Sequence, residues 1–140
     1  MSKVAVLFWS GTGNTEACAQ AVAEGAKAAG ADVEVFSTDQ FDAAKVAEFD
    51  AVALGCPAMG DEELEDSEFQ PLYDSIKADL AAKKVVLFGS YGWGEGDWMN
   101  SWKDDAAAAG ITLAADPVIV NEAPDDDAQE ALKALGAALA

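Results

Sequence analysis

One short turn near the N-terminus concentrates groups that could bind an anion. Its residues are Ser10-Gly11-Thr12-Gly13-Asn14-Thr15, which follow an apolar run at 4–9 and precede a helical pattern at 16–29. The free N–H groups of a helix's first turn and the helix dipole both favour negative charge at such a point. Hydroxyl and amide side chains add donors, and the two glycines let the backbone approach a ligand closely. The turn therefore predicts a phosphate site.

Two later loops carry groups suited to a flat ring. The segment Gly55-Cys56-Pro57-Ala58-Met59-Gly60-Asp61-Glu62 combines an apolar side chain, a glycine and carboxylates. The segment 89–96 has four glycines in eight residues, with Tyr91 and Trp93 between them. Either aromatic side chain could pack on the surface, but both lie outside any amphipathic period and could face a ligand. A planar ring beside a phosphate site describes a mononucleotide.

Alternating strands and helices must hold these three loops together. Strands are predicted at 3–9, 32–36, 51–56, 85–89 and 111–120, with a break at Asp116-Pro117, and helices at 14–29, 43–47, 67–80, about 98–106 and after Pro124. Ser67 is the predicted N-cap of the third helix. The alternation indicates an α/β fold in one domain over residues 1–140, with a five-stranded parallel sheet covered by helices on both faces. Strand order 2-1-3-4-5 would gather the three loops at the carboxyl edge, where such sheets bind ligands.

The charge balance excludes several classes of function. The chain has 26 acidic residues against eight lysines, a net charge of −18, and neither Arg nor His. A nucleic-acid surface needs clustered cations and is therefore excluded, as are histidine acid/base chemistry and an arginine clamp on phosphate. Such acidity favours solubility and steering toward basic partner proteins.

The chain shows no targeting segment and no metal-binding pattern. No stretch approaches the roughly 20 apolar residues of a membrane span, and the N-terminus lacks a signal-peptide pattern, so a cytoplasmic protein without membrane contact is expected. Cys18 and Cys56 are too few for a disulfide framework, and the chain has no His to complete a Cys/His metal site. Cys18 fits a core position, and Cys56 is either a buried strand end or a thiol near the ring.

Three motifs resemble the flavodoxin family. Residues 6–15 resemble its phosphate-binding signature, and Met59-Gly60-Asp61-Glu62 and Ser90-Tyr91-Gly92-Trp93-Gly94 resemble the two flavin-contacting loops of short-chain members from anaerobic bacteria. The resemblance spans the whole chain in the right order, and the fifth strand lacks room for the insertion of long-chain members. It implies a three-layer flavodoxin-like fold and non-covalently bound FMN.

The resemblance also implies roles for individual residues. The phosphate would take donors from Ser10, Thr12, Asn14, Thr15 and the backbone of Gly11 and Gly13. Trp9 would lie near the phosphate or close the core, and Pro57 stands where some relatives have a serine donor. The ring would lie between Met59 and Trp93, with Glu62 accepting the flavin N3–H and Gly60 turning its carbonyl to the N5–H of the semiquinone. The rest of the binding set comprises Ala58, Asp61, Ser90, Tyr91, Gly92 and Gly94.

The implied function is that of a low-potential one-electron carrier, shuttling between semiquinone and hydroquinone without a substrate-turnover site. The acidic residues 61–68 would orient a monomer transiently on basic patches of its reductase and its acceptor. The main alternative is a small NAD(P)H-dependent FMN quinone or flavin reductase, and a flavin-storage or assembly domain is a third. Three other classes are excluded because their motifs are missing. A response regulator needs paired acidic residues after the first strand, a tyrosine phosphatase needs Cys and Arg in its phosphate loop, and an NTPase needs Gly-Lys-Ser/Thr.

Overall fold

The computed structural model describes residues 3–9, 13–57, 67–91, 97–122 and 124–140. Five parallel strands form one sheet in the order β2-β1-β3-β4-β5, as predicted. The strands are β1 (Lys3–Phe8), β2 (Asp32–Ser37), β3 (Ala51–Gly55), β4 (Lys84–Tyr91) and β5 (Val118–Asn121). The helices are α1 (Asn14–Ala28), α2 (Ala43–Val46), α3 (Phe69–Leu80), α4 (Asp97–Ala108) and α5 (Asp126–Ala137), with a 3-10 turn η1 at Thr38–Gln40.

The burial of each strand follows from its place in the sheet. The central strands β1 and β3 are near-continuous apolar runs, and every residue of β3 is buried. The strand β2 alternates exposed and partly buried residues over most of its length, which confirms the prediction that it lies at an edge. At the other edge, β5 contains only four residues, preceded by an isolated bridge between Leu113 and Val85. The predicted break at Asp116-Pro117 is therefore confirmed, but its first half is a single bridge.

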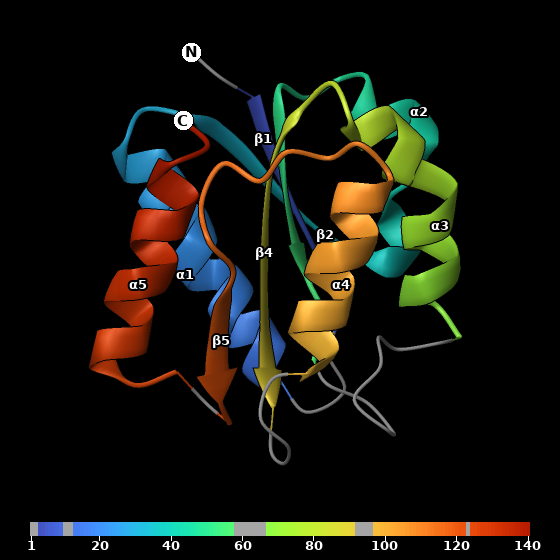
Figure 1. The fold of residues 1–140 in the computed structure, drawn as a ribbon. Helices are drawn as coiled ribbons and strands as arrows, with labels where there is room; N and C mark the ends of the chain where they lie inside the picture. The colour runs from blue at the N-terminus through green and yellow to red at the C-terminus, as the bar shows by residue number, and fades with distance from the viewer. Residues whose placement is uncertain (1–2, 10–12, 58–66, 92–96, 123) are drawn as a thin grey trace.

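Helices cover both faces of the sheet (Figure 1), giving the predicted three layers. The helices α1 and α5 pack on the face that carries Val4, Val6 and Val86. The helices α2, α3 and α4 pack on the opposite face, which carries Leu7 and Leu54. Successive residues of one strand thus feed two separate cores, as the pleat of a strand requires.

Two further boundaries, at the start of α3 and the end of β4, differ from the prediction. The helix α3 begins at Phe69, and its N-cap is Glu68 rather than Ser67. The strand β4 continues two residues beyond Gly89, because Ser90 and Tyr91 pair with Val120 and Asn121 of β5. Pairing with an edge strand thus overrode the loop character of a glycine-rich sequence. Among the described residues, no helix is both long and apolar enough to cross a membrane.

Candidate functional site

The helix α1 begins at the carboxyl end of β1 with a backbone that suits glycine. Gly13 is the N-cap of α1 with φ of +93°, and an added Cβ there would have no neighbour within 4 Å. The restriction is therefore the left-handed backbone rather than space. No side chain among the described residues caps α1 at this end. The predicted phosphate residues Ser10, Gly11 and Thr12 lie outside the described residues.

A buried pair of hydroxyl groups joins two of the three predicted loops. Thr15 Oγ1 lies 2.8 Å from Ser90 Oγ, although the two residues are 75 positions apart in the chain. Thr15 is 1% exposed and Ser90 is 4% exposed. The structure thus brings the first turn of α1 against the end of β4, as the strand order requires. Asn14, the remaining described donor of the turn, is half-buried.

The end of β4 differs from the loop that the sequence predicts. Tyr91 is half-buried, and its ring centroid lies 5.6 Å from that of Trp98 on α4, at an interplanar angle of 48°. Gly89 is required by close approach, because a Cβ there would meet the Cys56 carbonyl oxygen at 2.1 Å. This glycine is therefore a packing residue of a strand, and not a source of loop flexibility. Gly92, Trp93 and Gly94 lie outside the described residues.

The end of β3 is fixed from the neighbouring helix. The indole N–H of Trp98 donates to the Cys56 carbonyl oxygen at 3.1 Å. The Cys56 side chain is buried in the core under α3 and α4, so the core continues beyond β3, and Pro57 is half-buried. The interpretation of Cys56 as a buried strand end fits this burial. Ala58, Met59, Gly60, Asp61 and Glu62 lie outside the described residues.

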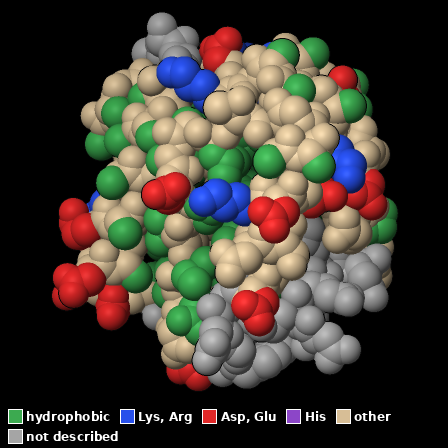
Figure 2. All heavy atoms as spheres, in the orientation of Figure 1, with side chains coloured by type: hydrophobic (Ala, Val, Ile, Leu, Met, Phe, Trp, Pro, Cys, Tyr) green, Lys and Arg blue, Asp and Glu red, His purple; other side chains and the backbone are tan. Residues whose placement is uncertain are grey.

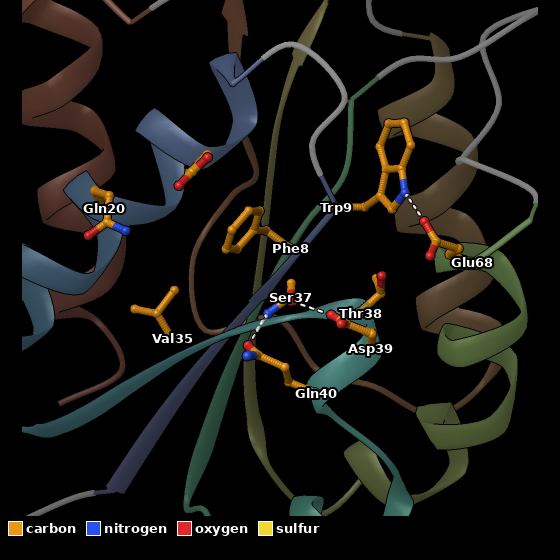
Figure 3. A pocket seen from close by; sticks show the side chains of 10 residues that line it. Phe8, Trp9, Gln20, Val35, Ser37, Thr38, Asp39, Gln40 and Glu68 are labelled. Atoms are coloured by element: carbon orange, nitrogen blue, oxygen red, sulfur yellow. Dashed lines mark hydrogen bonds between the residues drawn. The ribbon is translucent and has the colours of Figure 1, made fainter.

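Trp9 has a hydrogen-bond partner that could not be expected from the sequence. Its indole N–H donates to Glu68 Oε2 at 2.6 Å, which ties the end of β1 to the start of α3 (Figure 3). The Trp9 ring also packs partly against the core beneath α3 and α4. Glu68 belongs to the acidic run at 61–68 that is expected to face partner proteins. At least one of those carboxylates therefore also makes a hydrogen bond within the protein.

An open pocket of about 640 Å³ lies between the carboxyl ends of β1 and β2. Of the predicted site residues that the structure describes, it includes only Trp9 (Figure 3). Among the described residues, three carboxylates line it, from Glu16, Asp39 and Glu68, and no lysine does. Polar residues at the end of β2 and in η1 complete its wall. There, the Ser37 side chain accepts from the backbone N–H of Gln40 and the Gln40 side chain accepts from the backbone N–H of Ser37. Sequence reasoning missed this wall, although Ser37 and Thr38 follow a strand just as the turn at 10–15 does.

Comparison with known proteins decides the family. The family model described as "Flavodoxin" matches residues 6–135. Flavodoxin from Megasphaera elsdenii is 50% identical over 88% of this chain and 89% of its own length, and flavodoxin from Clostridium beijerinckii is 40% identical over 91% and 93%. The solution structure of two-electron reduced Megasphaera elsdenii flavodoxin matches with a TM-score of 0.89, covering 97% of each chain. This chain belongs to the flavodoxin family. The predicted resemblance to short-chain flavodoxins of anaerobic bacteria is confirmed.

Membership in the flavodoxin family makes FMN the cofactor and electron transfer the function of this chain. The described residues fit that cofactor. Gly13 opens α1 with a left-handed backbone, and Thr15 and Ser90 place two buried hydroxyls at the same edge of the sheet. A helix N-terminus with neutral donors can hold a phosphate without a cation, which suits a chain with no arginine.

Proposed function

We propose that the flavin of this chain carries single electrons at low potential and is held at the carboxyl edge of β1, β3 and β4. The observation that carries the proposal is the uncharged donor edge at Gly13, Thr15 and Ser90, in a chain that belongs to the flavodoxin family. FMN supplies the redox chemistry by accepting and releasing one electron at a time. The protein supplies the binding site, the exclusion of water and the surrounding charge.

We assign the phosphate to the residues that open α1. Asn14 and Thr15 and the backbone at Gly13 are described there, and Ser10, Gly11 and Thr12 complete the set in the sequence. The flavin ring is assigned to a position between Met59 and Trp93. Glu62 would accept a hydrogen bond from the flavin N3–H, and the Gly60 carbonyl would accept one from the N5–H of the one-electron-reduced flavin. These four assignments rest on the family motifs. The backbone of Asp61, Gly92 and Trp93 would contact the pyrimidine edge.

The low potential follows from the charge of the chain. With a net charge of −18, the protein opposes the addition of negative charge to its cofactor. One carboxylate ~10 Å from the ring, at an effective dielectric constant of ~20, opposes an added electron by about 1.7 kcal/mol, or roughly 70 mV, before salt screening. Figure 2 shows acidic side chains spread over the face of α4 and α5, with fewer basic ones among them. Several such charges would add their effects.

We infer that the same acidity selects transient partners with basic patches. Opposite charge steers diffusional encounter and raises association rates at low salt. The acidic run at 61–68 adjoins the loop assigned to the ring, so docking there would bring a partner near the cofactor. Association rates with a reductase or an acceptor should fall steeply as salt is added, and rates that ignore ionic strength would contradict the docking proposal.

The decisive experiment is an anaerobic redox titration of the FMN-loaded protein, followed by absorbance. We expect one acid-releasable FMN per chain and two separate one-electron steps, with the second well below the corresponding step of free FMN. Both electrons entering together, at the potential of free FMN, would overturn the one-electron proposal. Failure of the chain to bind FMN would overturn the site assignment as well.

A second anaerobic experiment tests the inference that the chain lacks substrate turnover. NADPH alone should leave the flavin oxidised, because the 2′-phosphate of NADPH has no arginine to pair with in this chain. Addition of a flavodoxin reductase should then bleach the flavin. Rapid bleaching by NADPH alone would instead identify an NAD(P)H-dependent reductase.

A further inference from the structure

We propose that Ser90 is a positioning residue for the phosphate of FMN. The Ser90 hydroxyl donates its hydrogen to Thr15 Oγ1, and this directs the hydrogen of the Thr15 hydroxyl toward the phosphate. The inference rests on the proposed binding of FMN phosphate at the start of α1. It adds a donor relay that begins on a different strand from the phosphate turn.

The geometry supplies the first half of the relay. The two oxygens lie 2.8 Å apart, the usual separation of a hydroxyl–hydroxyl hydrogen bond, and both side chains are at least nine-tenths buried. Thr15 is the second residue of α1, and Ser90 is the last residue but one of β4. Both elements are held in place, because β4 is paired with a strand on each side and α1 packs on α5.

The direction of the hydrogen bond follows from the charge of the ligand. Each hydroxyl has a single hydrogen, so only one of the pair can donate to the other. If Thr15 donated to Ser90, Thr15 would turn only lone pairs toward the anionic phosphate. If Ser90 donates, the Thr15 hydrogen is free to reach a phosphate oxygen. A hydroxyl that accepts one hydrogen bond also becomes a stronger donor in another. Donation from Ser90 to Thr15 is therefore favoured both because it frees the Thr15 hydrogen and because it strengthens Thr15 as a donor.

A purely structural role for the pair makes a different prediction. In that case the hydrogen bond only ties α1 to β4, and its loss would weaken the binding of every flavin equally. In the relay, its loss affects only ligands that carry a phosphate. FMN and riboflavin differ by that phosphate, so the ratio of their affinities separates the two roles.

The test compares Ser90→Ala with the wild-type protein after removal of FMN. We expect the FMN dissociation constant to rise about fivefold, as for the loss of one neutral hydrogen bond, because Thr15 keeps its hydroxyl but loses the bond that orients it. Riboflavin affinity should change less than about twofold. Ser75→Ala is the matched control, because Ser75 Oγ donates to the Leu72 carbonyl oxygen at 2.7 Å within α3. That control should leave both affinities unchanged.

Two further measurements keep the outcome decisive. In a Thr15→Val background, Ser90→Ala should lower FMN affinity no further, because the relay passes through Thr15. The phosphorus-31 resonance of bound FMN should shift in Ser90→Ala and stay in place in Ser75→Ala. If riboflavin binds too weakly or Thr15→Val does not fold, this resonance alone tests whether Ser90 acts on the phosphate. Equal losses for both flavins, additive effects or an unmoved resonance would overturn the relay. If the wild-type protein bound no FMN, the proposed function itself would fail.

Discussion

The two faces of the sheet are filled by different means. Between the sheet and α1 and α5, the core consists mainly of small and β-branched side chains, with several alanines on α1. Beneath α3 and α4, it contains large aromatic side chains, which are Phe69, Tyr73, Trp98 and Trp102. Helices separated by small residues approach one another through their backbones, whereas large side chains hold helices apart.

The close approach on the first face is measured by two glycines. An added Cβ on Gly25 of α1 would lie 1.9 Å from the Lys133 carbonyl oxygen of α5, and one on Gly136 of α5 would lie 2.0 Å from the Val22 carbonyl oxygen of α1. Backbone atoms have little freedom to move aside. The difference teaches that α1, to which we assign the phosphate of FMN, is held by the less adjustable of the two faces.

The largest effect is therefore expected from Gly25→Ala or Gly136→Ala. Each new methyl group forces the helices apart, and we expect a loss of about 3 kcal/mol in the free energy of unfolding, despite the better helix propensity of alanine. FMN affinity should fall with it, because α1 shifts relative to β4. Urea denaturation of the FMN-loaded and the FMN-free protein measures both effects.

The double variant is the control for this mechanism. Once one methyl group has separated the helices, the second has less to displace, so the two losses should sum to less than their separate values. Fully additive losses, or a stable Gly25→Ala protein, would show that this interface can adjust as readily as the aromatic face.

The second prediction concerns Cys18, which is fully buried on the α1/α5 face. Burial raises the pKa of its thiol from 9.0 to about 11. Above pH 9 the unfolded chain releases this proton while the folded protein keeps it, so stability falls as pH rises from 9 to about 11. The full contribution is at most about 3 kcal/mol, from a shift of about two pKa units.

Comparison with Cys18→Ala isolates this contribution. The free energy of unfolding of this variant should be lower than that of the wild type at pH 9, because the variant loses buried volume. It should decline less steeply between pH 9 and 11. Val22→Ala removes buried apolar volume from the same face without removing a titrating group, and its curve should run parallel to that of the wild type. A Cys18→Ala curve that also runs parallel would mean that the thiol does not stay protonated in the folded protein.

Much of this contrast could be predicted from the sequence, but not all of it. Apolar runs predicted the strands, and helical periodicity predicted the helix at about 98–106, because periodicity reports which side of an element is buried. Trp98, Trp102 and Ala106 lie on the buried face of α4. Gly89 reads as a loop residue because a local pattern cannot show that the Cys56 carbonyl approaches it from another strand. The bond from Trp9 to Glu68 joins residues 59 positions apart and was unpredictable for the same reason.

The candidate site shows the same division. The turn that opens α1 was predictable, since a strand, a glycine-rich turn and a helix follow one another in the sequence. The partnership of Thr15 with Ser90 was not, because it depends on how far β4 extends. The strand order indicated only that their loops would meet.

The third prediction tests whether the aromatic face depends on polar contacts or on volume. Trp98 and Trp102 are both buried on α4, but only Trp98 has a hydrogen-bond partner for its indole nitrogen among the described residues. Trp98→Phe should therefore cost about 1 kcal/mol more than Trp102→Phe in the free energy of unfolding. The two variants lose the same atoms, so each is the control for the other. Equal losses would show that volume alone matters on this face.

The smallest effect is expected from Tyr73→Phe. No group among the described residues meets hydrogen-bond geometry with the buried Tyr73 hydroxyl, although the Asp105 carboxylate and the Trp102 indole lie near it. The Tyr73 ring packs edge-on to that of Trp102, with centroids 6.0 Å apart. Burial and the nearby Asp105 carboxylate raise the pKa of Tyr73, so the hydroxyl stays protonated and uncharged. Removing a buried hydroxyl that makes no hydrogen bond should leave stability unchanged or raise it by up to about 1 kcal/mol. A clear loss in urea denaturation would mean that the hydroxyl is bonded in solution, for instance to a buried water, and that the aromatic face is held by polar contacts as well as by volume.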